Sequence, residues 1–164
     1  MPTRARRERL ADWLTLVGAL MLFASLFLTW SHQFSPAFLA VWGATEKLQG
    51  VPHDPTAWQV YSASDVLLAL LSVALVGMAL VGTHRARAVV LGLSLLALVF
   101  SLHALATPPT NGANIFDPSL SVPSYFPNSP AAGPGETVAS IALGVGIAGL
   151  LLSLRAAQRR SEPS

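Results

Sequence analysis

Four apolar stretches divide this 164-residue chain, at about residues 10–29, 64–82, 88–106 and 137–154. Each is roughly 18–20 residues long, and a helix of that length spans about 27–30 Å, the thickness of the hydrocarbon core of a bilayer. Only 11% of the residues are charged, against about 25% in an average soluble domain. The sequence therefore predicts a single all-α membrane domain over residues 1–164, folded as a bundle of four transmembrane helices.

The distribution of charge predicts how this bundle is oriented. Nine of the ten basic residues lie before the first stretch, in the short link between the second and third, or in the tail 155–164, and three acidic residues are expected on the same side: Glu8, Asp12 near the start of the first stretch, and Glu162. The two long loops, about 31–63 and 107–135, together with the first residues of the stretches that follow them, contain one basic and five acidic residues. Cytoplasmic segments of membrane proteins are enriched in Arg and Lys. We therefore expect a multi-pass protein of the bacterial cytoplasmic membrane, with both termini in the cytoplasm and both loops outside.

The basic N-terminal segment and the apolar stretch after it also have the form of a secretory signal peptide. An alternative is a twin-arginine signal at Arg6-Arg7. No small-residue cleavage motif follows the apolar stretch, and Trp30 at its end suits an anchor at the membrane interface. A retained signal-anchor helix is therefore the favoured interpretation. Trp13, Trp58 and Tyr61 also lie near the expected interfaces and are predicted to be interfacial anchors.

Small residues recur at helical spacing in the fourth stretch, at Ala142, Gly146 and Gly149. Small side chains let the backbones of neighbouring transmembrane helices approach each other closely. This stripe is therefore predicted to be the packing face of the fourth helix.

The two outer loops differ in composition. Residues 35–50 of the first loop have the signals of a short helix, with Ser35 as N-cap, Pro36 at the first helical position and Gly50 after the end. The second loop contains seven of the twelve prolines of the chain, which favours extended or irregular structure.

No motif predicts a cofactor, a metal ion or a catalytic site. The segment Gly144-Val-Gly-Ile-Ala-Gly149 matches G-x-G-x-x-G but lies inside an apolar stretch and lacks the preceding strand of a dinucleotide site. Only one of the four histidines, His103, falls within a stretch, so a haem held between two helices is disfavoured; His53-Asp54 is better explained by a turn than by a metal site. Cysteine is absent, and the basic residues form no continuous face for nucleic acid.

Three ionisable residues lie near the expected outer ends of the helices: Asp65, His103 and Glu136. Ionisable groups at membrane depth are costly and often mark a pathway. Asp65 and Glu136 also stand at expected helix starts, where an acid caps the helix or interacts favourably with its dipole. The sequence leaves open whether these residues form an outer polar cluster or are separate capping groups.

Several short segments together resemble small four-helix integral membrane proteins of actinobacterial type, whose function is unknown. They are Leu26-Phe-Leu-Thr-Trp30, Thr56-Ala-Trp-Gln-Val-Tyr-Ser-Ala-Ser-Asp-Val-Leu-Leu68, the turn with Arg85 and Arg87, Pro108-Pro109, and the basic tail. The resemblance covers the apolar stretches and implies the four-helix architecture without implying an activity.

The expected function is non-enzymatic. An accessory, scaffold or interaction protein would present the two outer loops to another membrane or extracytoplasmic protein, or to a second copy of the chain, while the helices contact the lipid bilayer. The alternative is a small channel or transporter subunit for an ion or small solute. A polar path continuing into the bundle would favour transport, and a dry interior of small and aliphatic residues would favour the scaffold.

Overall fold

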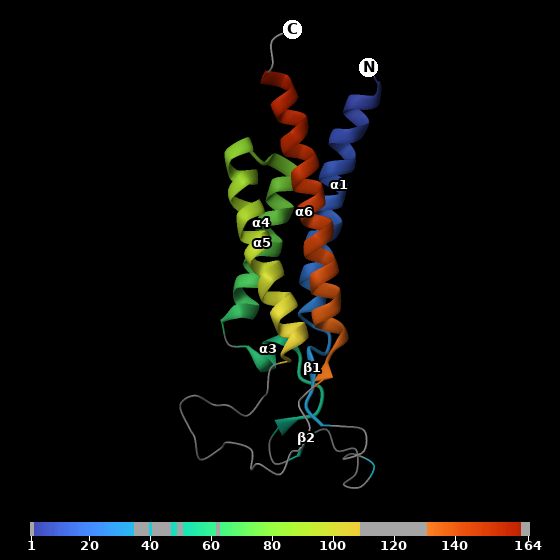
Figure 1. The fold of residues 1–164 in the computed structure, drawn as a ribbon, viewed down its shortest axis with the longest axis vertical. Coiled ribbons are helices and arrows are strands. Elements are labelled where there is room, and N and C mark those ends of the chain that lie inside the picture. Colours follow the sequence, from blue (N-terminus) through green and yellow to red (C-terminus); the bar gives the residue numbers. More distant parts are fainter. Residues whose placement is uncertain are drawn as a thin grey trace.

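Long helices placed side by side make up most of the molecule in the computed structural model (Figure 1). The structure describes residues 2–34, 40, 47–48, 51–61, 63–108 and 131–161. The helices are α1 (Pro2–Ser25), the single-turn α3 (Ala57–Val60), α4 (Ser64–Val81), α5 (His84–Ala106) and α6 (Pro134–Ser161). The prediction of an all-α fold is confirmed. Among the described residues, three segments are long and apolar enough to cross a membrane: Ser64–Val81, His84–Ala106 and Pro134–Ala157.

Local signals account for several of the helix starts. Pro134 is the first residue of α6, a position that suits proline because its φ is already helical and no N–H is needed there. Thr83 caps α5, and its hydroxyl accepts a hydrogen bond from the backbone N–H of Ala86 at 3.3 Å. At α3, the N–H of Thr56 donates to Oε1 of Gln59 at 3.0 Å. A proline and hydrogen-bonded polar side chains therefore mark these three helix starts.

Two pairs of very short strands lie at the end of the bundle away from the termini (Figure 1). β1 (Ser31–His32) pairs antiparallel with β4 (Ala131–Ala132), and β2 (Lys47–Leu48) pairs antiparallel with β3 (Val51–Pro52). The first pair joins the chain that leaves α1 to the chain that enters α6, which are about 100 residues apart in sequence.

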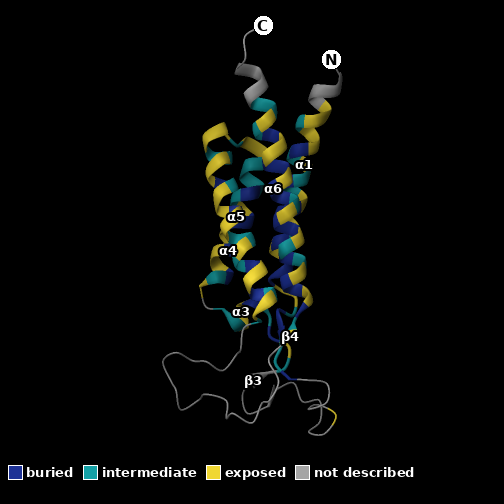
Figure 2. Cartoon of the chain, viewed as in Figure 1, coloured by how far each residue is buried: buried dark blue, intermediate teal, exposed yellow. Residues whose placement is uncertain are grey.

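The long helices form a ring in which α6 contacts α1 and α5, and α1 contacts α4. The contact between α1 and α6 is the most extensive, whereas α4 and α5 touch each other far less, although only two residues link them. Figure 2 shows the buried residues gathered on the inner faces of the helices and the exposed ones on the outer faces. The interior consists largely of aliphatic and small side chains, including Ala19, Leu22, Leu26, Leu68, Leu75, Ala139, Ala142, Leu143 and Leu150.

The described elements differ from the expected ones at their ends. α1 ends at Ser25 and is followed by a turn, so the helix stops before the end of the apolar stretch 10–29, whereas α6 begins at Pro134, before the fourth stretch. The expected short helix over 35–50 and the proline-rich part of the second loop lie mostly outside the described residues. The chain termini and the link Gly82-Thr83 lie at one end of the bundle, and β1 and β4 lie at the other, the loop end (Figure 1).

Candidate functional site

The segment that follows α1 is hydrogen-bonded on both sides at the loop end. The N–H of Trp30 donates to the carbonyl of Pro55 at 2.9 Å, and the carbonyl of Trp30 accepts from the N–H of Gly133 at 2.8 Å. The Trp30 side chain is fully buried, and its Nε1 donates to the carbonyl of Ser25 at 2.8 Å. A Cβ at Gly135 would collide with the Trp30 ring, so the indole lies directly against the first turn of α6.

This burial differs from the expectation that Trp30 is an interfacial anchor. Because α1 ends at Ser25 and the chain turns, Trp30 folds back over the end of its own helix and does not face outward. Of the other predicted anchors, Trp13 is 64% exposed and Trp58 is 40% exposed on the bundle surface, while Tyr61 is half-buried.

Glu136 lies in the first turn of α6 and is fully buried. Its backbone carbonyl accepts hydrogen bonds from the hydroxyls of Ser140 at 2.9 Å and of Ser101 at 3.4 Å, and these two hydroxyls lie 2.9 Å apart. Within the described part of the chain, neither carboxylate oxygen of Glu136 has a hydrogen-bond partner. The backbone carbonyl of Glu136 therefore accepts two hydrogen bonds, whereas its carboxylate accepts none from the described residues.

Aromatic rings connect α5 to this corner of the bundle. The Tyr61 ring contacts Trp30 edge-on at a centroid distance of 5.7 Å and Phe100 of α5 at 5.4 Å. Burial, reinforced by the negative charge of Glu136, raises the pKa of Tyr61 to about 12. Tyr61 therefore stays a neutral phenol at physiological pH, and the structure places it within electrostatic reach of Glu136.

The three residues of the expected outer cluster have different environments. Asp65 is buried in the first turn of α4, where its Oδ1 accepts from the N–H of Val66 at 2.8 Å. His103 is exposed, and its Nε2 lies 3.3 Å from Oγ1 of Thr107 on the same chain segment. Among the described residues, no contact joins these side chains to each other or to Glu136, because His103 lies on the outer face of α5 while Ser101 faces inward. The neighbour of Glu136 that the sequence missed is Tyr61.

The small residues of α6 face α1 at very short range. Ala142, Gly146 and Gly149 are buried, and a Cβ at Gly18 of α1 would lie 2.6 Å from the backbone nitrogen of Gly146. A Cβ at Gly149 would lie 2.6 Å from the backbone nitrogen of Thr15. The two backbones therefore approach so closely that only glycine is accommodated at these two positions.

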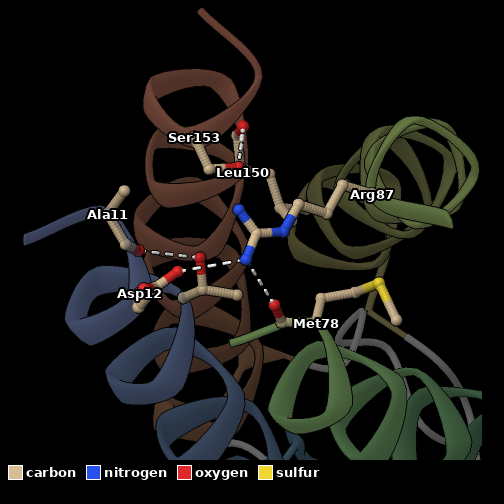
Figure 3. Close-up of polar contacts among 7 residues, drawn as sticks. Ala11, Asp12, Met78, Arg87, Leu150 and Ser153 are labelled. Atoms are coloured by element: carbon tan, nitrogen blue, oxygen red, sulfur yellow. Dashed lines mark hydrogen bonds and ion pairs between the residues drawn. The ribbon is translucent and has the colours of Figure 1, made fainter. Parts of the chain in front are cut away.

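A second polar site lies at the end of the bundle that holds the termini. Arg87 of α5 donates from Nη2 to the carbonyl of Met78 at 3.1 Å and pairs with Asp12 of α1 at 3.3 Å (Figure 3). A cleft of about 290 Å³ beside this pair is also lined by Glu8 and His84. The sequence has Asp12 near the start of one apolar stretch and Arg87 just before another. No sequence pattern predicts that these two residues, 75 positions apart, contact each other.

A third polar group is exposed at the loop end. Nδ1 of His32 lies 2.6 Å from Oδ1 of Asp54, and Nδ1 of His53 lies 2.9 Å from Oδ2 of the same carboxylate. Asp54 thus joins the end of β1 to the segment before α3. Within the described ranges, no group of three or more His, Cys, Asp or Glu side chains is placed to hold a metal ion.

Comparison of the chain with protein-family models, with curated proteins and with solved structures found no match. Of the polar sites, the corner around Glu136 combines full burial, a carboxyl group without a hydrogen-bond partner among the described residues, and nearby aromatic rings, and it is the candidate functional site.

Proposed function

We propose that this protein is a four-span protein of the cytoplasmic membrane that works by contact, as an accessory, scaffold or interaction protein. Both termini are in the cytoplasm, and the loops at about 31–63 and 107–135 face outward toward the partner. The observation that carries this proposal is the interior of the bundle, where most of the buried side chains among the described residues are aliphatic or small.

The outer faces of the helices support the membrane location. Large apolar side chains are widely exposed there; examples are Leu67, Leu70 and Val73 of α4 and Leu96 and Val99 of α5, each more than 60% exposed. Monomeric soluble proteins rarely expose contiguous apolar surface on this scale. Hydrocarbon chains of lipids would cover it without cost.

α1 is proposed as the fourth span. Residues 13–30 contain no Asp, Glu, Lys or Arg. The nearest charged residue, Asp12, pairs with Arg87, and pairing lowers the cost of placing both charges close to hydrocarbon. The extensive contact of α1 with α6 also supports its membership of the membrane bundle.

The orientation can be tested with single cysteines in this cysteine-free chain. We expect an impermeant maleimide added to intact cells to label a cysteine at Ser119, in the second outer loop, and to leave one at Thr83 unlabelled until the cells are lysed. Labelling at Thr83 in intact cells, without labelling at Ser119, would reverse the orientation.

The interior of the bundle supports contact in preference to conduction. Its middle contains Leu22, Leu75 and Leu143, which are all fully buried. The hydroxyls of Thr15 and Ser94, also buried, donate to carbonyls one turn earlier in their own helices. Such hydroxyls are satisfied and offer little to a passing ion, whereas channels line their paths with available polar groups.

The contact function can be tested by replacing residues 110–130 with a Gly/Ser linker of equal length. The replacement stops at 130 because Ala131–Ala132 pairs with β1. We expect the variant to unfold thermally at the wild-type temperature in detergent but to lose the protein that co-purifies with the wild type from native membranes. A variant that retains the partner would exclude this loop as the contact surface.

The alternative of a small channel or transporter subunit is favoured by one observation, the unpaired carboxylate of Glu136 inside the bundle. Liposomes that contain the purified protein distinguish the two functions. We expect no conductance and no saturable solute uptake. Saturable uptake that Glu136→Gln abolishes would replace the contact function by transport.

A further inference from the structure

We propose that the cleft beside Arg87 binds a phosphodiester that carries a primary ammonium group, which is the chemistry of an ethanolamine phospholipid headgroup. A membrane lipid is the expected source, because the cleft lies near the end of the charge-free part of α1. The inference goes beyond the contact function and uses only the membrane location proposed above. The loop replacement described there leaves every residue of the cleft unchanged, so failure of the contact function and failure of this site are distinguishable.

The cleft is formed where the α4–α5 hairpin stops short of the other two long helices. α1 and α6 continue beyond the link Gly82-Thr83 (Figure 1). α1 contributes two carboxylates to the lining, α5 an arginine and a histidine, and α6 four residues between 153 and 157. The volume of about 290 Å³ lies at the lower limit of the range of about 300–1,000 Å³ that is typical of small-molecule sites. The cleft therefore has room for a headgroup but not for a whole lipid.

Arg87 provides the part of the cleft that attracts an anion. Both of its hydrogen bonds, to Oδ1 of Asp12 and to the carbonyl of Met78, come from Nη2 (Figure 3). Within the described part of the chain, Nε and Nη1 make no hydrogen bond, and of these two nitrogens only Nε is shielded from solvent. A guanidinium group stays charged in proteins and donates from all three of its nitrogens. The N–H groups of Nη1 are therefore available to the oxygens of a phosphate.

Two carboxylates of α1 provide the part of the cleft that attracts a cation. Glu8 and Asp12 are four residues apart, on one face of α1, and both line the cleft. Oδ1 of Asp12 accepts from Arg87, whereas Oδ2 accepts no hydrogen bond from the described residues. A primary ammonium group donates three hydrogen bonds, which suits neighbouring carboxylates. A simple anion would be repelled by the carboxylates and a simple cation by Arg87, so the cleft favours a ligand that carries both charges.

The cleft lies at the level expected for lipid headgroups. The segment 13–30 of α1, which has no Asp, Glu, Lys or Arg, begins directly after Asp12. Trp13 is 64% exposed, and exposed tryptophans concentrate where headgroups meet hydrocarbon. Val81 and Val89, close to the cleft in sequence, are 83% and 63% exposed and offer apolar surface to acyl chains. A lipid would therefore place its headgroup in the cleft and its chains along the outer faces of the helices.

Native mass spectrometry of the full chain in detergent, with one lipid added at a time, tests this proposal. We expect the wild type to bind dioleoylphosphatidylethanolamine about tenfold or more tightly than the phosphatidylcholine or phosphatidylglycerol with the same chains. Phosphatidylcholine has the same charges but no ammonium N–H, and phosphatidylglycerol has the phosphate but no ammonium group. Equal affinity for the three lipids, or tighter binding of phosphatidylglycerol, would overturn the proposal.

Two arginine variants test whether the cleft is the binding site. We expect Arg87→Met to weaken binding of phosphatidylethanolamine about tenfold or more, because a charged hydrogen-bond donor is removed. Arg85→Met is the matched control, since it removes the same charge from the same end of the bundle, but Arg85 is exposed and does not line the cleft. Equal losses of affinity in the two variants would overturn the proposal.

Competition on the wild type does not depend on how the variants fold, and it distinguishes a lipid from a soluble ligand. We expect glycerophosphoethanolamine to displace bound phosphatidylethanolamine and glycerophosphocholine not to displace it. Displacement only in large excess would assign the cleft to the lipid, whose chains add affinity. Displacement at equal concentration would assign it to a soluble compound with the same headgroup chemistry. Equal displacement by the two compounds, or none by either, would overturn the proposal.

Discussion

Replacement of Gly149 by alanine should separate α1 from α6. A Cβ at this position would lie 2.6 Å from the backbone nitrogen of Thr15 and 2.7 Å from the carbonyl oxygen of Ala11, and it would also collide with the Thr15 hydroxyl. Ordinary contacts are about 3.5–4.0 Å, so one helix must move away by about 1 Å. Most of the obstacle is backbone, which cannot rotate out of the way as a flexible side chain could.

Two other glycines of α6 provide matched controls. A Cβ at Gly144 would meet nothing within 4 Å, and one at Gly146 would meet only the Leu75 methyl groups at 3.7 and 3.8 Å, an ordinary contact. All three alanine variants share the gain in helix preference of about 1 kcal/mol per residue. The difference between Gly149→Ala and Gly144→Ala therefore isolates the collision, which we expect to lower the free energy of unfolding by about 1–3 kcal/mol.

The variants can be compared by unfolding in mixed micelles with increasing sodium dodecyl sulfate, followed by circular dichroism. We expect Gly144→Ala and Gly146→Ala to be equally stable, and at least as stable as the wild type. Gly149→Ala should be less stable than the wild type. Thermal midpoints should differ by about 2–4 °C for each kcal/mol. Equal stability of Gly149→Ala and Gly144→Ala would refute the close approach of α1 and α6 at this position.

Two further predictions concern charges at opposite ends of the bundle. In a double-mutant cycle, Asp12→Asn and Arg87→Met should show a coupling energy of about 0.5–1 kcal/mol, as expected for a partly exposed pair; additive losses of stability would show that the pair contributes nothing. In a Tyr125→Phe background, absorbance at 295 nm should show the remaining Tyr61 ionising only near pH 12, and Glu136→Gln should lower this pKa because it removes a negative charge. The pKa of Tyr61 in the folded protein lies above that of an exposed tyrosine. The stability that Tyr61 burial contributes is therefore present below about pH 10 and is lost as the pH rises toward 12. Ionisation of Tyr61 near pH 10 would mean that its side chain is exposed.

Much of the helical architecture follows from local properties of the sequence. Long apolar stretches with few charges specify helices, and Pro134 and Thr83 specify where two of them begin. The basic segments all fall at the end of the structure that holds the termini, as expected from their positions in the chain. The first helix is the least well specified, because the apolar stretch continues to residue 29 while the helix ends at Ser25.

The candidate site could be predicted only in part. Glu136 stood out in the sequence as an acid beside an apolar stretch, but its neighbours did not. Asp65 and His103 are also ionisable residues near the ends of apolar stretches, but among the described residues neither contacts Glu136. Asp65 is hydrogen-bonded within the first turn of α4, and His103 lies on the exposed face of α5 beside Thr107. Tyr61 gave only the signal of an interfacial aromatic residue, and its role depends on the ring contacts with Trp30 and Phe100.

The sequence by itself determined the helices, their approximate ends and the small-residue stripe of α6, since hydrophobicity and helical period depend on neighbours within a few residues. Only the tertiary structure decided that this stripe faces α1, that Trp30 folds inward over Ser25, and that Arg87 reaches Asp12 across 75 residues of chain. These contacts depend on how distant helices are rotated against one another. That rotation is set by the packing of all the helices together, and no short stretch of sequence contains it.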